Sequence, residues 1–412
     1  MKIWKRLVIA LSMIGPGLFL IGYNIGTGSV TTMAKAGAEF GMTLFWALVL
    51  SCFFTYILMV AYGKMTLVSG RTALFNFKTQ LKGGKILAIY IIIALITGEV
   101  LALIGIMGIV AELIQEGIRL IAGSRNLMIN TGWIILVLAV LLYFLLWFGR
   151  YKVFEKILTV FVILMALCFI IVFVMVRPSF SAILEGMVPG IPNVPGALTL
   201  VAAMVGTTCS AAVFIIRSTV LAEKGWTVDN LKNEKRDAFS SAFMMLFLSG
   251  VIMAVAAGTL NIMGLKLDTT LDMISLFEPM GGKVAALLLI LGIAGAGIST
   301  VFPIVLIAPW LISDYTGKSR DIKSPLFRGL ILAGLVFAFG SIFLEQSPPI
   351  LMVFSQAFQA AILPAVAIPI FFILNRKDIM QSHTASLRLN IGLLAVILFS
   401  FLTTYIAIRG FL

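Results

Sequence analysis

The dominant pattern along this chain is a series of apolar runs separated by short polar segments. A transmembrane helix needs about 20 predominantly apolar residues. Runs of that length predict eleven spans, at 7–39, 42–68, 84–110, 130–149, 154–176, 195–222, 238–263, 283–312, 327–344, 348–374 and 388–409. The pattern therefore predicts an all-α membrane protein, in which residues 1–412 form a single transmembrane domain and no water-soluble domain is present.

Composition agrees with this prediction and narrows the function classes. The 412 residues are 61% hydrophobic and 11% charged, whereas a soluble domain carries about 25% charged residues. The net charge of +13 does not indicate a nucleic-acid partner, because the basic residues flank apolar runs. No small-residue cleavage site follows the first run, so we expect a retained span. The three cysteines lie within apolar runs and predict reduced packing residues rather than disulfides.

The lysines and arginines predict the orientation in the membrane. With the amino terminus in the cytoplasm, 23 of the 30 fall in cytoplasmic segments, as the positive-inside rule requires. The other seven are Lys35, Arg119, Arg125, Arg177, Lys266, Lys283 and Arg409. We expect a multi-pass protein of the plasma (inner) membrane with a cytoplasmic amino terminus, and a solvated cytoplasmic loop at 223–237.

Two spans are interrupted by small polar residues, and they lie five spans apart. The first is broken at Gly26-Thr27-Gly28-Ser29 and the sixth near Gly206-Thr207-Thr208-Cys209-Ser210. Breaks at matching positions of two halves are typical of inverted-repeat transporters with a binding site at the membrane midplane. We therefore expect spans 1 and 6 to be discontinuous, with repeats at 7–176 and 195–374 and an additional span at 388–409. Simple kinks in two ordinary helices remain the alternative.

A broken helix leaves backbone N–H and C=O groups without partners, and each costs several kcal/mol in hydrocarbon. Glycine permits the unwound backbone and lets a solute approach it. Thr27 and Ser29 add hydroxyls that both donate and accept hydrogen bonds. A half-helix starting near Ser29 would point its positive end at the break. The segment is therefore a candidate cradle for a solute.

Several motifs resemble the Nramp metal-ion transporters, which share the LeuT-type fold. "IGPGLFL" and "AGAEFG" resemble the two ends of the family's first helix, and "GTTCSAAVFIIRS" resembles its sixth. "SQAFQAAILPAVAIP" matches its tenth helix without a gap, and "TGEVLALIG" resembles its third. The resemblance covers spans 1 to 10. It implies a LeuT-type fold of 5+5 inverted repeats with about eleven transmembrane helices, and a secondary transporter rather than an enzyme.

The metal ligands of the family are replaced in this chain. The resemblance places Gly26 and Ser29 at the family's aspartate and asparagine, and Ser210 at its methionine. Thr27 and Ala211 stand at the two prolines. Arg217 replaces a histidine linked to proton movement, and an arginine does not titrate. The family's glutamine is kept as Gln356, Gln359 is added one turn later, and Glu99 replaces an aspartate of the third helix.

These positions predict a binding site without carboxylate or imidazole ligands. Such a site suits transition metals poorly. The candidate solute-binding residues are Asn24, Gly26, Thr27, Gly28, Ser29, Thr208, Cys209, Ser210, Ala211, Gln356 and Gln359. We expect alternating-access transport of a small polar or organic solute rather than manganese or iron. Two alternatives remain open, namely a divalent metal transporter with a weakened, hydrated-ion site and a solute-binding membrane sensor. No cofactor is expected.

Two charged residues within spans are candidates for the coupling or proton path. Glu99 lies in the middle of the third span, where a carboxylate is costly and indicates function; the alternative is a structural hydrogen bond. Arg217 lies two turns after the second break, where it could pair with Glu99 or extend to the cytoplasmic surface. The coupling ion could be a proton or sodium, and the resemblance suggests Ser299 and Thr300 as sodium ligands.

Overall fold

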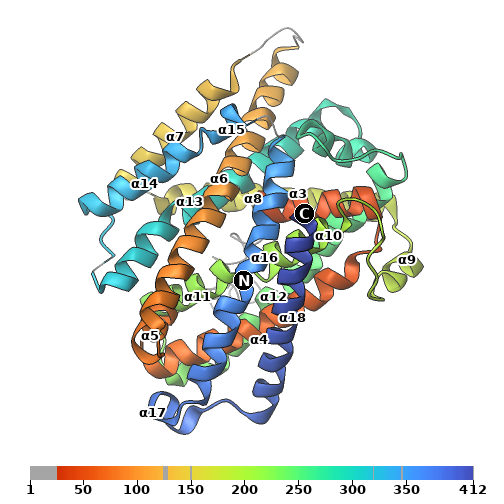
Figure 1. Ribbon diagram of the computed structural model, residues 1–412. Coiled ribbons are helices and arrows are strands. Elements are labelled where there is room, and N and C mark those ends of the chain that lie inside the picture. The colour runs from red at the N-terminus through yellow and green to blue at the C-terminus, as the bar shows by residue number, and fades with distance from the viewer. Residues whose placement is uncertain (1–25, 124–128, 149–150, 319, 345–346, 412) are drawn as a thin grey trace, which may run out of the picture.

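The computed structural model describes residues 26–123, 129–148, 151–318, 320–344 and 347–411, and these residues form helices and connecting loops without a β-strand (Figure 1). The all-helical prediction is therefore confirmed. Asn24 and the first part of the first span lie outside the described residues.

Most predicted spans correspond to one long helix each. The helices are α3 (Thr27–Phe40), α4 (Phe45–Ser69), α5 (Ala73–Gln80), α6 (Gly84–Ala122), α7 (Thr131–Trp147), α8 (Tyr151–Val176), α9 (Phe180–Glu185), α10 (Ala197–Thr208), α11 (Ala211–Glu223), α12 (Leu231–Ala256), α13 (Gly282–Thr316), α14 (Pro325–Phe337), α15 (Gly340–Phe343), α16 (Pro348–Asn375), α17 (Lys377–Met380) and α18 (Leu387–Phe411). Short 3₁₀ or π turns occur at Val228–Asn230, Ala257–Asn261, Leu271–Met280 and Gln381–His383.

The described helices account for the predicted number of spans. Eight are long and apolar enough to cross a membrane, and two shorter apolar helices lie at Thr131–Trp147 and Ile163–Val176. Helix α3 supplies the described part of the first span. Helix α6 continues to Ala122, twelve residues beyond the predicted end at position 110. The prediction ended too early because the apolar run stops at the first charged residues, whereas the helix continues through them. The proposed division into two repeats stays a prediction.

Helix α16 runs through the middle of the molecule, with α6 and α18 beside it (Figure 1). Helix α10 also packs on α16, and glycine makes this approach possible: a Cβ at Gly206 would lie 1.7 Å from the Gln356 carbonyl oxygen. Helix α3 lies equally close to α12, where a Cβ at Gly37 would lie 2.2 Å from the Met253 carbonyl oxygen. Helix α3 also contacts α10 and α16, so the two interrupted spans and α16 lie together in the core.

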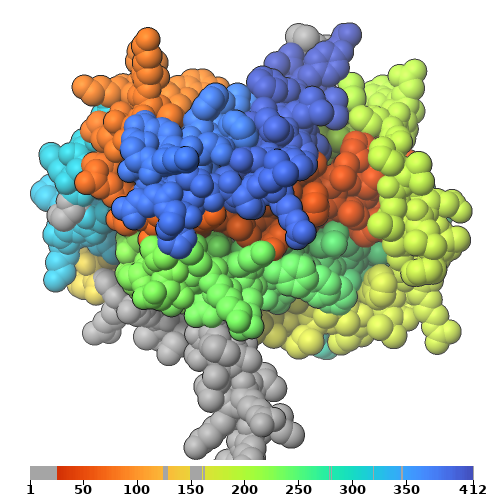
Figure 2. All heavy atoms as spheres, turned by 90° about the horizontal axis from the view of Figure 1, so that it is seen from below, coloured from red at the N-terminus to blue at the C-terminus, as the bar shows by residue number. Residues whose placement is uncertain are grey.

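The end of the molecule that carries α5 and α17 is formed by loops and short helices (Figure 1). Seen from that end, the carboxyl-terminal helices lie next to the segment that joins α11 to α12 (Figure 2). Lys78 of α5 donates a hydrogen bond to the Tyr315 carbonyl at the end of α13, and Arg376 donates one to the Gln80 carbonyl. Helix α5 thus joins α13 to the connection after α16.

Candidate functional site

The sixth span is broken, as the sequence predicts. Helix α10 ends at Thr208 and α11 begins at Ala211. Between them, Cys209 has φ −110° and ψ 47°, and Ser210 is extended with φ −69° and ψ 133°. The positive end of α11 therefore lies at the break, with Ser210 as its first flanking residue.

Helix α3 begins in the same way at the first interruption. Gly26 is extended (φ −74°, ψ −172°) and precedes a helix that starts at Thr27, two residues before the predicted start near Ser29. A Cβ at Gly26 would lie 1.9 Å from the Thr300 hydroxyl oxygen of α13, so only glycine fits here. The amino-terminal ends of α3 and α11 both lie in the core of the bundle.

A cavity lies between these two helix ends, and the space within it, including the part open to solvent, amounts to about 360 Å³. Its walls come from α3, α6, the α10–α11 break, α13 and α16. Among the described residues it is lined by Gly28, Ser29, Glu99, Ala102, Ile106, Thr207, Ser210, Thr300, Ile304, Met352, Gln356 and Gln359. Six of these were predicted from the sequence as solute-binding or coupling residues: Gly28, Ser29, Glu99, Ser210, Gln356 and Gln359. We call this space the central cavity.

Glu99 is the carboxylate in the wall of the central cavity, and the prediction of a site without a carboxylate is wrong in this respect. Its side chain is buried, with 4% of the residue exposed. The Gln359 amide Nε2 donates to Glu99 Oε1 over 2.8 Å, and the Ser210 hydroxyl donates to Gln359 Oε1 over 3.4 Å. A hydrogen-bonded path therefore runs from the helix break to the carboxylate.

Two hydroxyls in the wall are linked to neighbouring helices. The hydroxyls of Ser29 and Ser249 of α12 lie 3.1 Å apart. The Thr300 hydroxyl donates to the Ala296 carbonyl of its own helix over 2.8 Å and keeps lone pairs for a ligand. Ser299, the other suggested sodium ligand, does not line the cavity.

Five of the predicted residues lie beside the cavity rather than in its wall. Gly26, Thr27, Cys209 and Ala211 are buried at the helix ends without lining the space. Thr208 is turned towards α4: its hydroxyl donates to Ser51 Oγ over 2.6 Å, and Thr55 donates to its carbonyl over 2.9 Å. Thr208 therefore fastens α10 to α4.

Residues that the sequence analysis missed complete the wall. Thr207 belongs to the predicted interruption but was not chosen, although it faces the cavity while Thr208 does not. Met352 lies one helical turn before Gln356, and residues with that spacing share a face of a helix. That spacing was the signal available in the sequence. Ala102, Ile106 and Ile304 add an apolar surface.

Arg217 does not pair with Glu99 and does not extend to the surface, so both sequence-based interpretations of it are wrong. It is fully buried, and its Nη2 lies 2.9 Å from Glu234 Oε1 and 2.9 Å from Asp237 Oδ2. Both acidic residues belong to α12 and are buried, which also corrects the prediction of a solvated loop at 223–237. The three residues form what we call the buried ion cluster.

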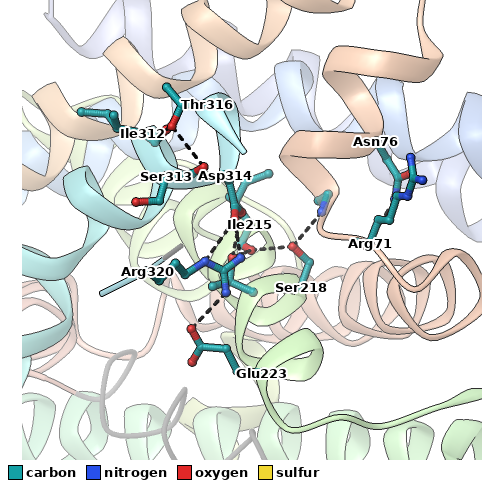
Figure 3. A network of polar contacts seen from close by, with 12 residues as sticks. Arg71, Asn76, Ile215, Ser218, Glu223, Ile312, Ser313, Asp314, Thr316 and Arg320 are labelled. Atoms are coloured by element: carbon teal, nitrogen blue, oxygen red, sulfur yellow. Dashed lines mark hydrogen bonds and ion pairs between the residues drawn. The ribbon is translucent and has the colours of Figure 1, made fainter. Parts of the chain in front are cut away.

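A second group of charges connects the ends of α11 and α13 (Figure 3). Arg320 donates to Asp314 of α13 and, over 3.0 Å, to Glu223 of α11. Thr219 of α11 donates to Asp314 Oδ2 over 3.4 Å. Burial alone would lower the pKa of the Arg320 guanidinium, but the Asp314 and Glu223 carboxylates outweigh it and raise that pKa. Arg320 thus stays charged and joins the two helices.

The described residues contain no group of three or more His, Cys, Asp or Glu side chains placed to hold a metal ion. The three cysteines are buried and free. The donor set of the central cavity is one carboxylate, two amides, four hydroxyls and one thioether, together with two helix amino termini.

Comparison with known proteins identifies relatives over nearly the whole chain. The family model described as "Natural resistance-associated macrophage protein-like" matches residues 17–409. The "Divalent metal cation transporter MntH" of Staphylococcus aureus strain Mu3 is 26% identical over 97% of this chain and 92% of its own. The protein of the same name from Yersinia enterocolitica is 25% identical over 71% of this chain and 70% of its own.

Solved structures share the fold at lower identity. The manganese transporter of Eremococcus coleocola, in complex with an aromatic bis-isothiourea substituted compound, superimposes with a TM-score of 0.72 at 16% identity, over 100% of this chain and 89% of its own. Mhp1, a nucleobase-cation-symport-1 family transporter with bromovinylhydantoin bound, gives 0.62 at 15% identity, over 96% and 93%.

These neighbours and the central break of the sixth span establish a LeuT-type fold. The family match covers the spans, the interrupted segments and the cavity residues alike. The chain belongs to the Nramp family of membrane transporters.

Proposed function

We propose that this protein moves a small polar organic solute through the central cavity by alternating access. The observation that carries the proposal is the chemistry of the cavity wall. The wall combines two helix amino termini, hydroxyls of Ser29 and Ser210, and amides of Gln356 and Gln359, so it presents many uncharged hydrogen-bonding groups to a polar solute.

The two helix ends indicate which part of the solute they would hold. The amino termini of α3 and α11 carry partial positive charge and unpaired backbone N–H groups, which favour an anionic group such as a carboxylate. Two such ends oppose the binding of a divalent cation. The replacement of the family's aspartate by Gly26 removes a carboxylate from this place, and Thr300 of α13 occupies the space beside the glycine.

Glu99 and Gln359 would serve the opposite side of the solute. The Glu99 carboxylate can accept a hydrogen bond from an ammonium or hydroxyl group, or it can hold the coupling proton. Its hydrogen bond from Gln359 connects it to Ser210 at the helix break. Binding of the solute at the break would then be sensed at the carboxylate, which is the requirement for coupling. Arg217 is neutralised by Glu234 and Asp237 and would take no protons.

A divalent metal cation is the second candidate, because relatives are named divalent metal cation transporters. In this chain the ligands would be a Glu99 oxygen, the Gln356 or Gln359 carbonyl and the Met352 thioether. This set has one fixed negative charge, and hard cations prefer several carboxylates. A cation would therefore be held as a partly hydrated ion.

The proposed orientation places the α5 end in the cytoplasm. This end carries most of the basic residues, as the positive-inside rule requires. The protein would reside in the plasma (inner) membrane.

The test is a ligand screen followed by transport. Purified protein in lipid nanodiscs is heated with amino acids, organic acids and divalent metals, and stabilising compounds are then tested for uptake into proteoliposomes. We expect stabilisation and uptake of a carboxylate-bearing organic solute, and manganese uptake far below that of the Staphylococcus aureus relative in the same vesicles. Equal manganese uptake by the two proteins would overturn the proposal and favour the metal.

A further inference from the structure

A second polar cavity lies at the end of the molecule opposite α5, between α6, α7, α15 and the start of α16 (Figure 1). The space within it, including the part open to solvent, amounts to about 620 Å³. Among the described residues, its wall carries one carboxylate, that of Glu112, and four hydroxyls, those of Thr131, Thr269, Ser341 and Ser347. We call this space the distal cavity, and in the proposed orientation it faces away from the cytoplasm.

The distal cavity is separated from the central cavity by about one turn of helix. Pro348 lines the distal cavity and Met352 lines the central cavity, and four residues of helix rise by about 6 Å. Glycines of α6 let the helices close the space between the two cavities. A Cβ at Gly108 would lie 2.8 Å from Pro348 Cγ, and one at Gly105 would lie 3.2 Å from the Met352 backbone nitrogen. The distal cavity therefore lies where a solute would arrive before it reaches the central cavity.

The wall of the distal cavity is held in place by hydrogen bonds of its own. Ser347 Oγ donates to the Asp268 carbonyl over 2.6 Å, and the Thr269 backbone N–H donates to Asp272 Oδ2 over 2.7 Å. These bonds fasten the loop that carries Thr269 to the start of α16. Because the Ser347 hydroxyl gives its proton to a carbonyl, its lone pairs are left for a ligand.

The helices that begin at the distal cavity offer few N–H groups to it. Pro348 and Pro349 are the first two residues of α16, and proline has no N–H. The next two N–H groups of α16 donate to the Ser347 carbonyl. In α7, the Gly132 N–H donates to the Asn130 side chain over 2.8 Å. The distal cavity therefore suits an anionic group poorly.

The carboxylate and the hydroxyls of the distal cavity match a primary ammonium group, which carries three N–H donors and no acceptor. The Glu112 side chain is half-buried, and the fully buried Thr270 lies beside it. Gly108, Ile135 and Pro348 are buried and form an apolar floor, on which the carbon chain of an amine can pack. A hard divalent cation, in contrast, prefers several carboxylates.

We propose that the distal cavity binds the primary ammonium group of small organic solutes. The ammonium group lies against the Glu112 carboxylate and the hydroxyl oxygens, and the carbon chain lies on the apolar floor. Binding here needs no transport, whereas the role of the cavity as the first station on the way to the central cavity rests on the proposed function. Since the helix ends at the central cavity favour an anionic group, the solute that both cavities accept is a small zwitterion.

The test titrates purified protein in lipid nanodiscs with propylamine and with propanol, and follows binding by calorimetry. Propylamine is protonated at neutral pH, as a lysine side chain is, and propanol has the same carbon chain without the charge. We expect propylamine to bind about tenfold more tightly than propanol, which corresponds to about 1.4 kcal/mol, because hydrogen bonds between charged groups are stronger than neutral ones. Neither sodium nor magnesium should displace propylamine.

Two substitutions locate the propylamine site, each with a matched control. Glu112→Gln should remove the preference for propylamine over propanol, whereas Glu185→Gln, at an exposed position outside the wall, should keep it. Thr269→Trp should obstruct the cavity and weaken binding, whereas Leu271→Trp, outside the wall, should not. Thr269 and Leu271 are both exposed, so these variants are expected to fold, and thermal unfolding without a probe checks this.

Uptake into proteoliposomes separates this inference from the proposed function. For an amino-bearing solute from the ligand screen, Glu112→Gln should raise the KM of uptake by about tenfold, the same factor by which it weakens propylamine binding. If no organic solute is taken up while propylamine binding depends on Glu112, the proposed function fails and the ammonium site stands.

Four results would overturn the inference itself. Equal affinities for propylamine and propanol in the unaltered protein would show that the charge is not recognised. An undiminished preference in Glu112→Gln, or undiminished binding in Thr269→Trp, would place the amine elsewhere. Displacement of propylamine by sodium or magnesium would assign the cavity to metal cations. Uptake with an unaltered KM in Glu112→Gln would remove the cavity from the path of the solute.

Discussion

The buried ion cluster and the central cavity both contain buried carboxylates, but they differ in what surrounds the charge. In the cluster, Arg217 lies between Glu234 and Asp237, and a Cβ at Gly63 would lie 2.0 Å from Glu234 Oε1, so the space is filled. In the cavity, Glu99 accepts a hydrogen bond from Gln359 and lies beside empty space. Filled space indicates a structural role for the buried charges, whereas a carboxylate beside a cavity is placed to meet a ligand.

The largest effect is expected from a substitution that breaks the buried ion cluster. Arg217→Met leaves Glu234 and Asp237 buried without their cation, and loss of one partner of a buried ion pair costs about 3–5 kcal/mol. Thermal unfolding in nanodiscs should show a correspondingly large loss of stability. Arg236→Met, at an exposed position of α12, is the control and should change little. An unaltered unfolding temperature in Arg217→Met would mean that the cluster is not structural.

The next largest effect is expected from a substitution that fills the central cavity. A Cβ at Gly28 would lie 2.5 Å from the Met352 methyl and 3.0 Å from Gln356 Nε2, so Gly28→Leu projects into the space for the solute. Solute affinity should fall by about a hundredfold or more, since the side chain takes the place of the ligand. Calorimetric titration with the solute from the screen measures this. Gly329→Leu, in open space on α14, is the control; equal affinities in both variants would place the solute elsewhere.

A smaller effect separates binding from coupling. Glu99→Gln keeps the shape of the side chain and its contact with Gln359 but removes the titrating group. Transport should fall by about a hundredfold, which is the lower end of what a positioned proton-transfer group contributes. Its pH dependence should flatten, while the stability of the protein should be kept. Solute uptake measured across a series of pH values tests both the loss of transport and the flattened pH dependence. Glu116→Gln on the same helix is the control, and a pH profile unchanged in Glu99→Gln would assign Glu99 to packing.

The smallest effect concerns the charges that join α11 to α13. Arg320→Gln removes the pairs with Asp314 and Glu223, and partly exposed pairs contribute about 0.2–1 kcal/mol. Unfolding should be affected only slightly, and less at high salt. Lys318→Gln, at an exposed neighbouring position, provides the comparison. A loss as large as that of Arg217→Met would show that this network, too, is structural.

The sequence was sufficient to predict the membrane-spanning helices and the positions of the breaks. Apolar runs of membrane length specify spans, and the small polar residues at 26–29 and 206–210 stood out within them. The number of spans and the discontinuity at Cys209 and Ser210 followed from these signals. The half of the first span before Gly26, with Asn24, lies outside the described residues.

The directions of side chains could not be predicted in the same way. In a helix buried on most sides, no polar face fixes its rotation, so nothing in the sequence showed that Thr207 faces the cavity and Thr208 faces α4. Glu99 was found as a charge, but not as a wall residue of the cavity. Glu234 and Asp237 lie among exposed charges, and only tertiary structure reveals that α12 buries both against Arg217.

The two sides of the break at Cys209 and Ser210 both pack on α4 and α16, but each side has polar anchors of its own. Thr208 and Gly206 secure α10 to α4 and α16, while Arg217 and Thr219 secure α11 to α12 and α13. In the proposed transport cycle, a displacement of α12 or α13 would act on α11 through Arg217 and Thr219 and would have no such polar link to α10. The break is therefore where we expect the two halves of the span to move relative to each other.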